Sequence, residues 1–445
     1  MTVLEVKDGG IPGGFQVAHV LPPNPKGEMW KLLTYGDLGR LDINFEEFIL
    51  DLEDELERAY AEFGGERGKE GVFLIGFSTV SRSESEESIA ELVELARSAG
   101  KTVLERAIQI KKQPDPRYLI GKGKLKEIIL GAKQVGADIL IFDVELTPAQ
   151  IKAISEETNL RVMDRTQLIL EIFAQRARSS EGKIQVELAS LRYTLPRLIG
   201  RGVEFSQLGG GIGTRGPGEQ KIEEERRRIR DRISRLERET KELGRRRGHT
   251  RKRRTKAGVI TVTLIGYTNA GKSTLFNTLT ESSVVVEDKL FSTLNPTTRR
   301  LRLPGGREIL LTDTVGFIKN LPEDLVKAFR ATLEELGGSS LLIHLVDASD
   351  LLCEERVEAV EGILKSTGFD YIPRFIVLNK IDKVPDEIVW RLRKIYSAPA
   401  VSAPSGETFR EFLERLDTEV DRVLLKEQKE NFISESGEAG KSFQI

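Results

Sequence analysis

The chain has 445 residues, 39% of them hydrophobic, which is enough for two or three domains with buried cores. One cysteine, Cys353, excludes a disulfide framework and a cysteine-rich metal site, and the three histidines lack metal-ligand spacing. No apolar run approaches the roughly 20 residues that cross a bilayer, and no export signal begins the chain. We therefore expect a cytoplasmic, multidomain, monomeric protein whose association with membranes is at most peripheral.

Basic residues are concentrated in one segment, although the net charge is only −2. Residues 221–256 hold 17 Lys and Arg against 7 Asp and Glu, whereas the other 409 residues hold 51 against 63. Such a block is usually a solvated helix face. Its arginine clusters at 226–228, 245–247 and 251–254 favour nucleic acid as a partner over that simpler interpretation.

Residues 1–68 form an N-terminal extension to which we assign no chemistry. The glycines at 9–14 and the prolines at 22–25 predict irregular structure, and residues 45–60 predict an acidic amphipathic helix.

Residues 69–178 predict a small parallel α/β domain. Apolar, β-branched runs at 72–76, 102–105, 139–142 and 160–163 alternate with helical patterns, one of which stops at Gly100 while another starts at Pro148. The segment 120–124, Ile-Gly-Lys-Gly-Lys, lacks phosphate-loop spacing. A flexible basic loop is therefore the favoured interpretation, and a second nucleotide site stays open.

Residues 179–257 predict an antiparallel helical hairpin. Each of the two predicted helices carries a narrow apolar stripe, and the two stripes can pack against each other. The stripes consist of residues 184, 188, 191 and 195 and of residues 222, 229, 233, 236 and 243. A glycine-dense loop at 209–218 separates them. Such loops are often plain linkers, but between two paired helices this one is placed to bring backbone close to RNA. We expect RNA contacts, and none with DNA, from Gly209, Gly210, Gly211, Arg215, Arg226, Arg227 and Arg228.

Residues 258–425 predict a Ras-like P-loop domain. A buried strand at 259–265 leads into a complete phosphate-binding loop, in which Lys272 is placed for the β- and γ-phosphates and Ser273 for Mg²⁺. A chance match in an ordinary turn is much less probable with a strand before and a helix after. The loop comprises Gly266, Tyr267, Thr268, Asn269, Ala270, Gly271, Lys272, Ser273 and Thr274.

Two further segments are expected around the γ-phosphate. The strand ending at Asp313-Thr314-Val315-Gly316 offers a carboxylate behind Mg²⁺ and a Gly316 N–H that bonds only the triphosphate. The other segment is Phe291, Ser292, Thr293, Leu294 and Asn295, in which Thr293 is the chosen Mg²⁺ ligand and Thr297 and Thr298 are rivals. We expect the catalytic groups to be Lys272, Asp313 and Gly316.

The base should be guanine. A buried run at 375–378 ends in Asn379-Lys380-Ile381-Asp382, and the Asp382 carboxylate can accept from N1–H and the 2-amino group, which adenine lacks. The backbone of Ser402, Ala403 and Pro404 is a weaker candidate for the guanine O6.

One expected residue is absent. Phe317 stands where many GTPases place the glutamine that orients water, so a partner or a second cation must assist hydrolysis. Asn269 could bring K⁺ to the β/γ bridge, or it could merely tolerate a turn, and the two are about equally favoured.

Residues 117–124, 209–219, 266–274, 291–298 and 313–317 together resemble the HflX family of ribosome-associated GTPases. The resemblance covers roughly residues 70–425. It implies a GTPase that binds the large ribosomal subunit through its N-terminal and hairpin regions, splits stalled or stressed ribosomes, and tolerates some ATP. It also implies that residues 11–50 correspond to the end of an extension in longer members. Asn295 and residues 219–221 depart from the family's usual pattern without touching the nucleotide chemistry.

The expected protein is therefore a multidomain α/β GTPase that uses Mg²⁺, and K⁺ as an open possibility, with residues 426–445 as a frayed tail. Two alternatives share its motifs. One is a GTP-gated scaffold that recruits a protein or a membrane, with arginines that merely solvate the hairpin. The other is a GTPase that assists ribosome assembly.

Overall fold

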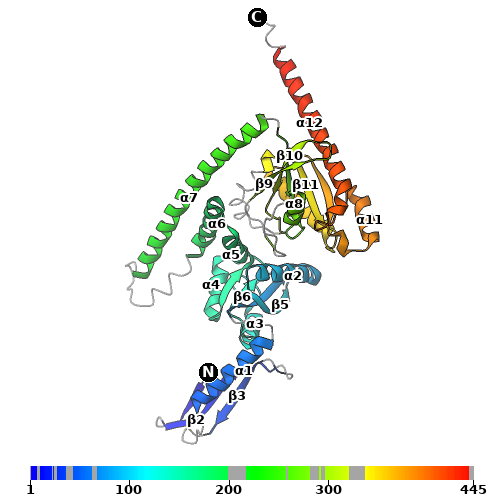
Figure 1. The fold of residues 1–445 in the computed structure, drawn as a ribbon. Helices are drawn as coiled ribbons and strands as arrows, with labels where there is room; N and C mark the ends of the chain where they lie inside the picture. The colour runs from blue at the N-terminus through cyan, green and yellow to red at the C-terminus, as the bar shows by residue number, and fades with distance from the viewer. Residues whose placement is uncertain are drawn as a thin grey trace. The chain divides into compact units, whose positions relative to one another are not determined.

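The computed structural model describes residues 2–7, 11–22, 24, 28–36, 44–62, 68–198, 217–256, 259–280, 290–291, 296–319 and 336–439. These residues form three β-sheets with helices between them (Figure 1). The chain divides into two compact units, one made of residues 1–172 and 193–227 and the other of residues 173–192 and 228–445.

The first sheet is antiparallel and has the order β1-β2-β3. It contains β1 (Thr2–Lys7), β2 (Ile11–Val20) and β3 (Trp30–Tyr35), and α1 (Phe45–Glu62) follows, as the amphipathic pattern predicts. The expectation of irregular structure is wrong for residues 11–14, because β2 already begins at Ile11; residues 9 and 10 lie outside the described residues. A Cβ at Gly14 would lie 2.9 Å from the Tyr35 carbonyl oxygen, so this glycine permits close strand pairing.

The second sheet is fully parallel, with the order β5-β4-β6-β7. Its strands are β4 (Gly71–Ser78), β5 (Thr102–Ile110), β6 (Ile139–Phe142) and β7 (Arg161–Asp164). Four helices accompany them, α2 (Arg82–Ser98), α3 (Lys122–Gln134), α4 (Pro148–Glu157) and α5 (Arg165–Arg176). The short β6 is buried at every position, as its continuous apolar run predicts.

The segment 120–124 is ordered, which corrects the expectation of a flexible loop. Ile120 is buried, Gly121 takes φ +85°, and α3 begins at Lys122. The Lys122 ammonium lies 2.9 Å from Glu157, whose carboxylate also accepts from the Tyr118 hydroxyl at 2.9 Å. The glycine therefore serves a tight turn into a helix.

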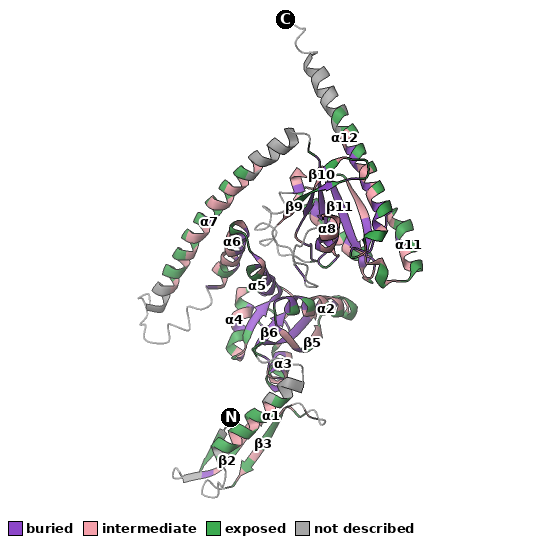
Figure 2. Ribbon diagram, viewed as in Figure 1, coloured by how far each residue is buried: buried purple, intermediate pink, exposed green. Residues whose placement is uncertain are grey.

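Helices α6 (Ser180–Arg197) and α7 (Pro217–Lys256) form the hairpin that the apolar stripes predict. Figure 1 shows them side by side and running in opposite directions. The Arg232 guanidinium binds Glu187 of α6 at 2.7 and 2.8 Å, and the Arg192 guanidinium lies 2.6 Å from Glu237. Leu236 is fully buried, whereas most described residues of α7 are coloured exposed or intermediate in Figure 2.

The third sheet has the order β12-β11-β8-β10-β9, and β9 alone is antiparallel to its neighbour. Its strands are β8 (Thr261–Ile265), β9 (Thr297–Arg302), β10 (Glu308–Asp313), β11 (Leu341–Asp347) and β12 (Arg374–Asn379). The helices of this part are α8 (Lys272–Thr280), α10 (Cys353–Thr367), α11 (Asp386–Tyr396) and α12 (Phe409–Ala439). The short turns are η3 (Leu336–Gly338), η4 (Ile381–Lys383) and η5 (Gly406–Thr408).

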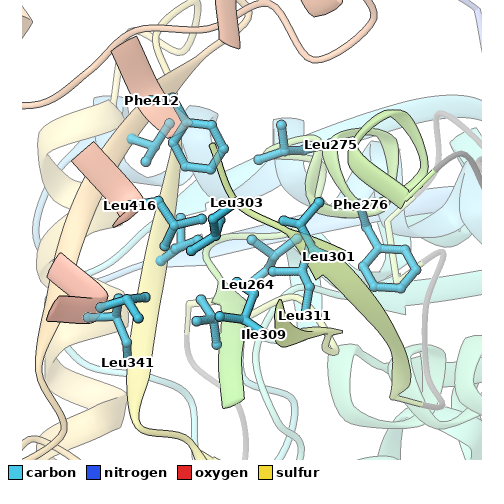
Figure 3. Packing of buried hydrophobic residues seen from close by; sticks show 14 of the residues in the cluster. Leu264, Leu275, Phe276, Leu301, Leu303, Ile309, Leu311, Leu341, Phe412 and Leu416 are labelled. Carbon is cyan, nitrogen blue, oxygen red and sulfur yellow. The ribbon is translucent and has the colours of Figure 1, made fainter. Parts of the chain in front are cut away.

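The hydrophobic core around the third sheet lies between that sheet and the helices α8 and α12. Figure 3 shows Phe276 of α8 and Phe412 and Leu416 of α12 beside sheet residues such as Leu264 and Leu311. Helix α12 continues to Ala439, so the frayed tail expected from Lys426 onward is wrong for residues 426–439.

The α/β multidomain architecture expected from the sequence is thus confirmed, with its parallel sheet, its hairpin and its P-loop domain. In the part of the chain that the structure describes, no helix combines the length and the apolarity needed to cross a bilayer.

Candidate functional site

The phosphate loop connects the carboxyl end of β8 to the first turn of α8. Gly266 takes φ +147°, and a Cβ there would lie 2.3 Å from the Leu345 carbonyl oxygen of β11. Gly271 takes φ +90°, and a Cβ would lie 2.2 Å from the Asn379 Nδ2 of β12. Both positions therefore require glycine, for backbone conformation and for space. The loop is held closely against the carboxyl ends of β11 and β12, and it leads into the start of α8.

Lys272 is buried at the centre of this loop. Its Nζ donates to the Tyr267 carbonyl at 2.7 Å and to the Gly266 carbonyl at 3.1 Å. Burial lowers the pKa of the Lys272 ammonium to about 8, while the Asp313 carboxylate opposes this shift and Lys380 adds to it. Burial destabilises the charged form of Lys272, and a phosphate beside the ammonium would stabilise that form.

Ser273 and Asp313 meet behind the loop. The Ser273 hydroxyl donates to Asp313 Oδ2 at 2.7 Å, and both residues are buried. The Thr314 hydroxyl donates to the Leu264 carbonyl at 2.7 Å and fixes the chain just after β10. A hydroxyl and a carboxylate oxygen are hard donors of the kind that Mg²⁺ prefers, so these two residues fit such an ion. Among the described residues, no group of three or more His, Cys, Asp and Glu side chains is placed to hold a metal ion.

The segment after β10 touches the phosphate loop directly. A Cβ at Gly316 would lie 2.8 Å from the Thr268 Cα and 3.0 Å from Lys272 Nζ, so only glycine permits this approach. Phe317 pairs with the loop through its backbone, donating to the Gly266 carbonyl at 3.1 Å and accepting from the Thr268 N–H at 2.7 Å. Its side chain is 3% exposed. Phe317 is therefore a packing residue, as its lack of hydrogen-bonding atoms predicts.

On the opposite side, Asn379 joins three chain segments. Its Nδ2 donates to the Ala270 carbonyl of the phosphate loop at 2.7 Å, and its Oδ1 accepts from the Ala403 N–H at 2.9 Å. The residue is 1% exposed. The Asn379 amide therefore ties the phosphate loop to the segment 402–404.

Asp382 stands at the open side of the site. The Ser402 hydroxyl donates to Asp382 Oδ1 at 2.6 Å, and Ser402 itself is buried, so the serine side chain orients the carboxylate. Lys380 takes φ +60°, and its ammonium lies 2.7 Å from Asp347 at the end of β11. Ile381 lies beside them in η4, and Pro404 is exposed. An oriented, exposed carboxylate is suited to accept two hydrogen bonds from one edge of a purine.

Asn269 is exposed at the tip of the loop with φ +62°. This conformation suits either interpretation of the residue, because asparagine tolerates left-handed turns. Thr274 lies in the first turn of α8, and Val315 lies between Thr314 and Gly316.

Some expected site residues lie elsewhere. Phe291 takes φ +57° and is buried, and its ring packs edge-on against Phe173 of α5 at 4.6 Å. Arg226 is partly buried and paired with Glu223 at 3.3 Å, whereas Arg227 and Arg228 are exposed. The remaining expected residues lie outside the described part of the chain, namely Ser292, Thr293, Leu294, Asn295, Gly209, Gly210, Gly211 and Arg215.

Sequence reasoning missed several supporting residues. Asp347 pairs with Lys380, and the Thr278 hydroxyl of α8 donates to the Ala403 carbonyl at 2.8 Å. The ring of Tyr267 lies 4.2 Å below the Arg356 guanidinium. Asp347 ends a buried strand, which was a usable signal. Nothing in the local sequence marks Thr278 or Arg356, because their partners are distant along the chain.

The strand, loop, helix and guanine-side segments together define a P-loop GTPase. Family models described as "GTP-binding GTPase N-terminal", "GTP-binding GTPase Middle Region" and "50S ribosome-binding GTPase" match residues 86–174, 176–254 and 261–380. The GTPase HflX of Caldanaerobacter subterraneus subsp. tengcongensis is 47% identical over 361 residues, which are 81% of this chain and 82% of the relative. The GTPase HflX of Escherichia coli K12 is 42% identical over 347 residues, 76% and 82% of the two chains.

Among solved structures, a crystal structure of SsGBP with GDP is 26% identical with a TM-score of 0.46, and covers 80% of this chain and 99% of that one. The chain belongs to the HflX family, and it is a GTPase. The resemblance noted from the sequence motifs is confirmed.

Proposed function

We propose that this protein is a Mg²⁺-dependent GTPase whose GTP form binds the large ribosomal subunit and separates stalled or stressed ribosomes into subunits, with hydrolysis driving release. The observation that carries the proposal is one chain holding both a nucleotide site and a basic helix. The match of residues 261–380 to a model named for 50S ribosome binding, and the HflX relatives, support the same partner.

The nucleotide half of the proposal assigns roles to the residues of the site. Lys272 holds the β- and γ-phosphates, and Ser273 would ligate Mg²⁺ with the Asp313 carboxylate behind it; the ion supplies positive charge to the phosphates when bound. Gly316, which approaches Lys272, offers its N–H to the γ-phosphate. Asp382, oriented by Ser402, reads guanine. The role of Thr293 as the second Mg²⁺ ligand remains an expectation from the sequence.

Water positioning needs help from outside the switch. Phe317 is buried and apolar, so its side chain cannot orient the attacking water. We propose that the ribosome supplies the missing group or that K⁺ at Asn269 shares the developing charge.

The ribosome half rests on helix α7. The segment 221–256 carries a net charge of +10, and Arg227 and Arg228 are exposed within it. Basic side chains that neutralise RNA phosphates release counterions, so binding weakens as salt rises. We propose that α7 and the loop 209–218 contact ribosomal RNA and that the parallel α/β domain contributes to the same interface.

The test is co-sedimentation of the full chain with 50S subunits, from 50 to 300 mM KCl. The nucleotide is GppNHp, a GTP analogue that is not hydrolysed. The double substitution Arg227→Gln with Arg228→Gln should weaken binding and make the slope of log affinity against log salt shallower by about 0.7–0.9 per lost phosphate contact. The matched control is Arg410→Gln with Arg422→Gln on α12, two exposed arginines on another helix that should leave the slope unchanged. No pelleting with GppNHp, or a slope that does not depend on α7, would favour the GTP-gated scaffold.

Splitting is tested separately. Replacing residues 209–218 by a short turn should preserve GTP binding and abolish dissociation of 70S ribosomes in sucrose gradients. Splitting at the parental rate would make the loop a connector. A role in ribosome assembly predicts instead that deleting the gene leaves precursor subunits in cells without a splitting defect in vitro.

A further inference from the structure

The side chain of Tyr267 reaches from the phosphate loop to the segment after Gly316. Its phenol oxygen accepts the N–H of Lys319 at 2.7 Å, and the tyrosine is 6% exposed. Tyr267 occupies the second position of the loop, where the nucleotide chemistry calls for backbone and not for a side chain. Its hydroxyl therefore needs an explanation other than phosphate binding.

The Tyr267 hydroxyl lies beside a segment that also pairs with the phosphate loop through its backbone. Phe317 is paired with the loop by two backbone hydrogen bonds, one to Gly266 and one from Thr268. Two residues farther on, Lys319 lies in a turn, and its N–H faces the Tyr267 hydroxyl. The phenol oxygen is the acceptor for this N–H.

The tyrosine ring is itself held from the other side. The Arg356 guanidinium of α10 lies 4.2 Å from the ring centroid, and Arg356 is ion-paired with Asp350. A cation over the ring face is attracted by its quadrupole and fixes the ring plane. The ion pair between Lys319 and Glu355, at 3.5 Å, is about half-exposed on both sides and adds little. Helix α10 thus contacts the Tyr267 ring through Arg356.

We propose that Tyr267 is a positioning residue for the switch. By accepting the Lys319 N–H, its phenol holds residues 316–319 on the phosphate loop in the arrangement that brings Gly316 to Lys272. Because that arrangement presents the Gly316 N–H to the γ-phosphate, the phenol favours the triphosphate over the diphosphate and promotes hydrolysis. This inference rests on the proposed role of Gly316.

The experiment uses Tyr267→Phe in the full chain, which removes the oxygen and keeps the ring under Arg356. The affinities for mant-GDP and mant-GppNHp and the single-turnover hydrolysis rate are measured together. Loss of one hydrogen bond to a backbone N–H should lower both the GppNHp-to-GDP affinity ratio and the hydrolysis rate by about 3- to 10-fold. The affinity for GDP should stay within about twofold. Tyr371→Phe is the control, since Tyr371 is exposed and lies outside the site.

A direct readout is amide hydrogen exchange of the peptide containing Lys319 in the GppNHp complex. Exchange should be faster in Tyr267→Phe and unchanged in Tyr371→Phe. The variant Arg356→Gln should lower the GppNHp-to-GDP affinity ratio of the otherwise unsubstituted protein. It should have no further effect on that ratio in the Tyr267→Phe background, because Arg356 acts through the phenol.

Three results would overturn the proposal. They are unchanged affinities for both nucleotides in Tyr267→Phe, equal losses of GDP and GppNHp affinity, which would leave their ratio unchanged and indicate a merely structural tyrosine, or unchanged exchange at Lys319. Gly316→Ala separates this failure from failure of the parent assignment. If Gly316→Ala removes the preference for GppNHp and Tyr267→Phe does not, only the role of the phenol is wrong. If Gly316→Ala has no effect, the γ-phosphate assignment is wrong as well.

Discussion

The buried ammonium of Lys272 makes nucleotide binding depend on pH in a range where ordinary lysines do not titrate. Burial lowers its pKa to about 8 in the protein without nucleotide. Phosphate binding requires the charged form, so the contribution of Lys272 to the affinity should be nearly constant below pH 7 and fall as pH rises through 8. At pH 9, one unit above the pKa, only about a tenth of the lysine is protonated and the apparent affinity should fall about tenfold. A lysine with an ordinary pKa near 10.4 would lose only a few per cent of its charge there.

The assay is isothermal titration of GDP with Mg²⁺ at pH 7, 8 and 9. At pH 8, binding should take up about half a proton, which is measured by repeating the titration in buffers of different ionisation enthalpy. Lys272→Arg is the control, because a guanidinium stays charged throughout and any remaining pH dependence belongs to the nucleotide. A tenfold loss of affinity at pH 9 in the Lys272→Arg variant too, or no loss in the parent, would refute the argument.

The same shift has an opposite effect on the protein without nucleotide. Between about pH 8 and the ordinary lysine pKa near 10.4, the unfolded chain holds a proton that the folded protein has lost. The contribution of Lys272 to the free energy of unfolding therefore rises with pH in that window and is constant below it. With GDP bound, this rise should disappear.

Three further variants test other parts of the site. Asp382→Asn should weaken GTP binding and improve xanthine nucleotide binding, since the amide donates toward a 2-oxo group; unchanged GTP affinity in competition assays would contradict guanine recognition by this carboxylate. Asn379→Ala removes two buried hydrogen bonds and should lower the free energy of unfolding by about 2–4 kcal/mol. Unfolding is measured by the fluorescence of Trp390 in a Trp30→Phe background, in which Trp390 is the sole tryptophan. A loss below about 0.5 kcal/mol would mean that water replaces the amide. Replacing KCl by NaCl at equal ionic strength should slow hydrolysis in the parent but not in Asn269→Ala, and equal rates in both salts for the parent would exclude the cation role.

The sequence predicted the elements whose cause is local. Buried apolar runs located the strands at β4, β6, β8 and β12, and the glycines and Lys272 located the phosphate loop. The guanine-side segments followed from their order along the chain, because the carboxyl ends of parallel strands meet at one edge.

What escaped prediction depends on contacts between distant residues. The glycines of this segment predict irregular structure by propensity, but for residues 11–14 the pairing of β2 with β1 overrides it. The polar residues 426–439 predict a tail, yet they extend α12, whose first half is anchored in the core by Phe412 and Leu416. The packing of Phe291 on Phe173 joins residues more than a hundred positions apart, and no local pattern indicates it.

The contact between Gly271 and Asn379 affects how substitutions in the phosphate loop of this protein are interpreted. Any side chain at 271 would push on the Asn379 amide, which lies 2.2 Å from where its Cβ would stand. A substitution in the phosphate loop would then release the segment 402–404 and disturb Ser402, the serine that aims Asp382. Gly271→Ala should therefore weaken the binding of both the phosphates and the base, so a loss of guanine affinity in such a variant does not by itself identify a residue that contacts the base.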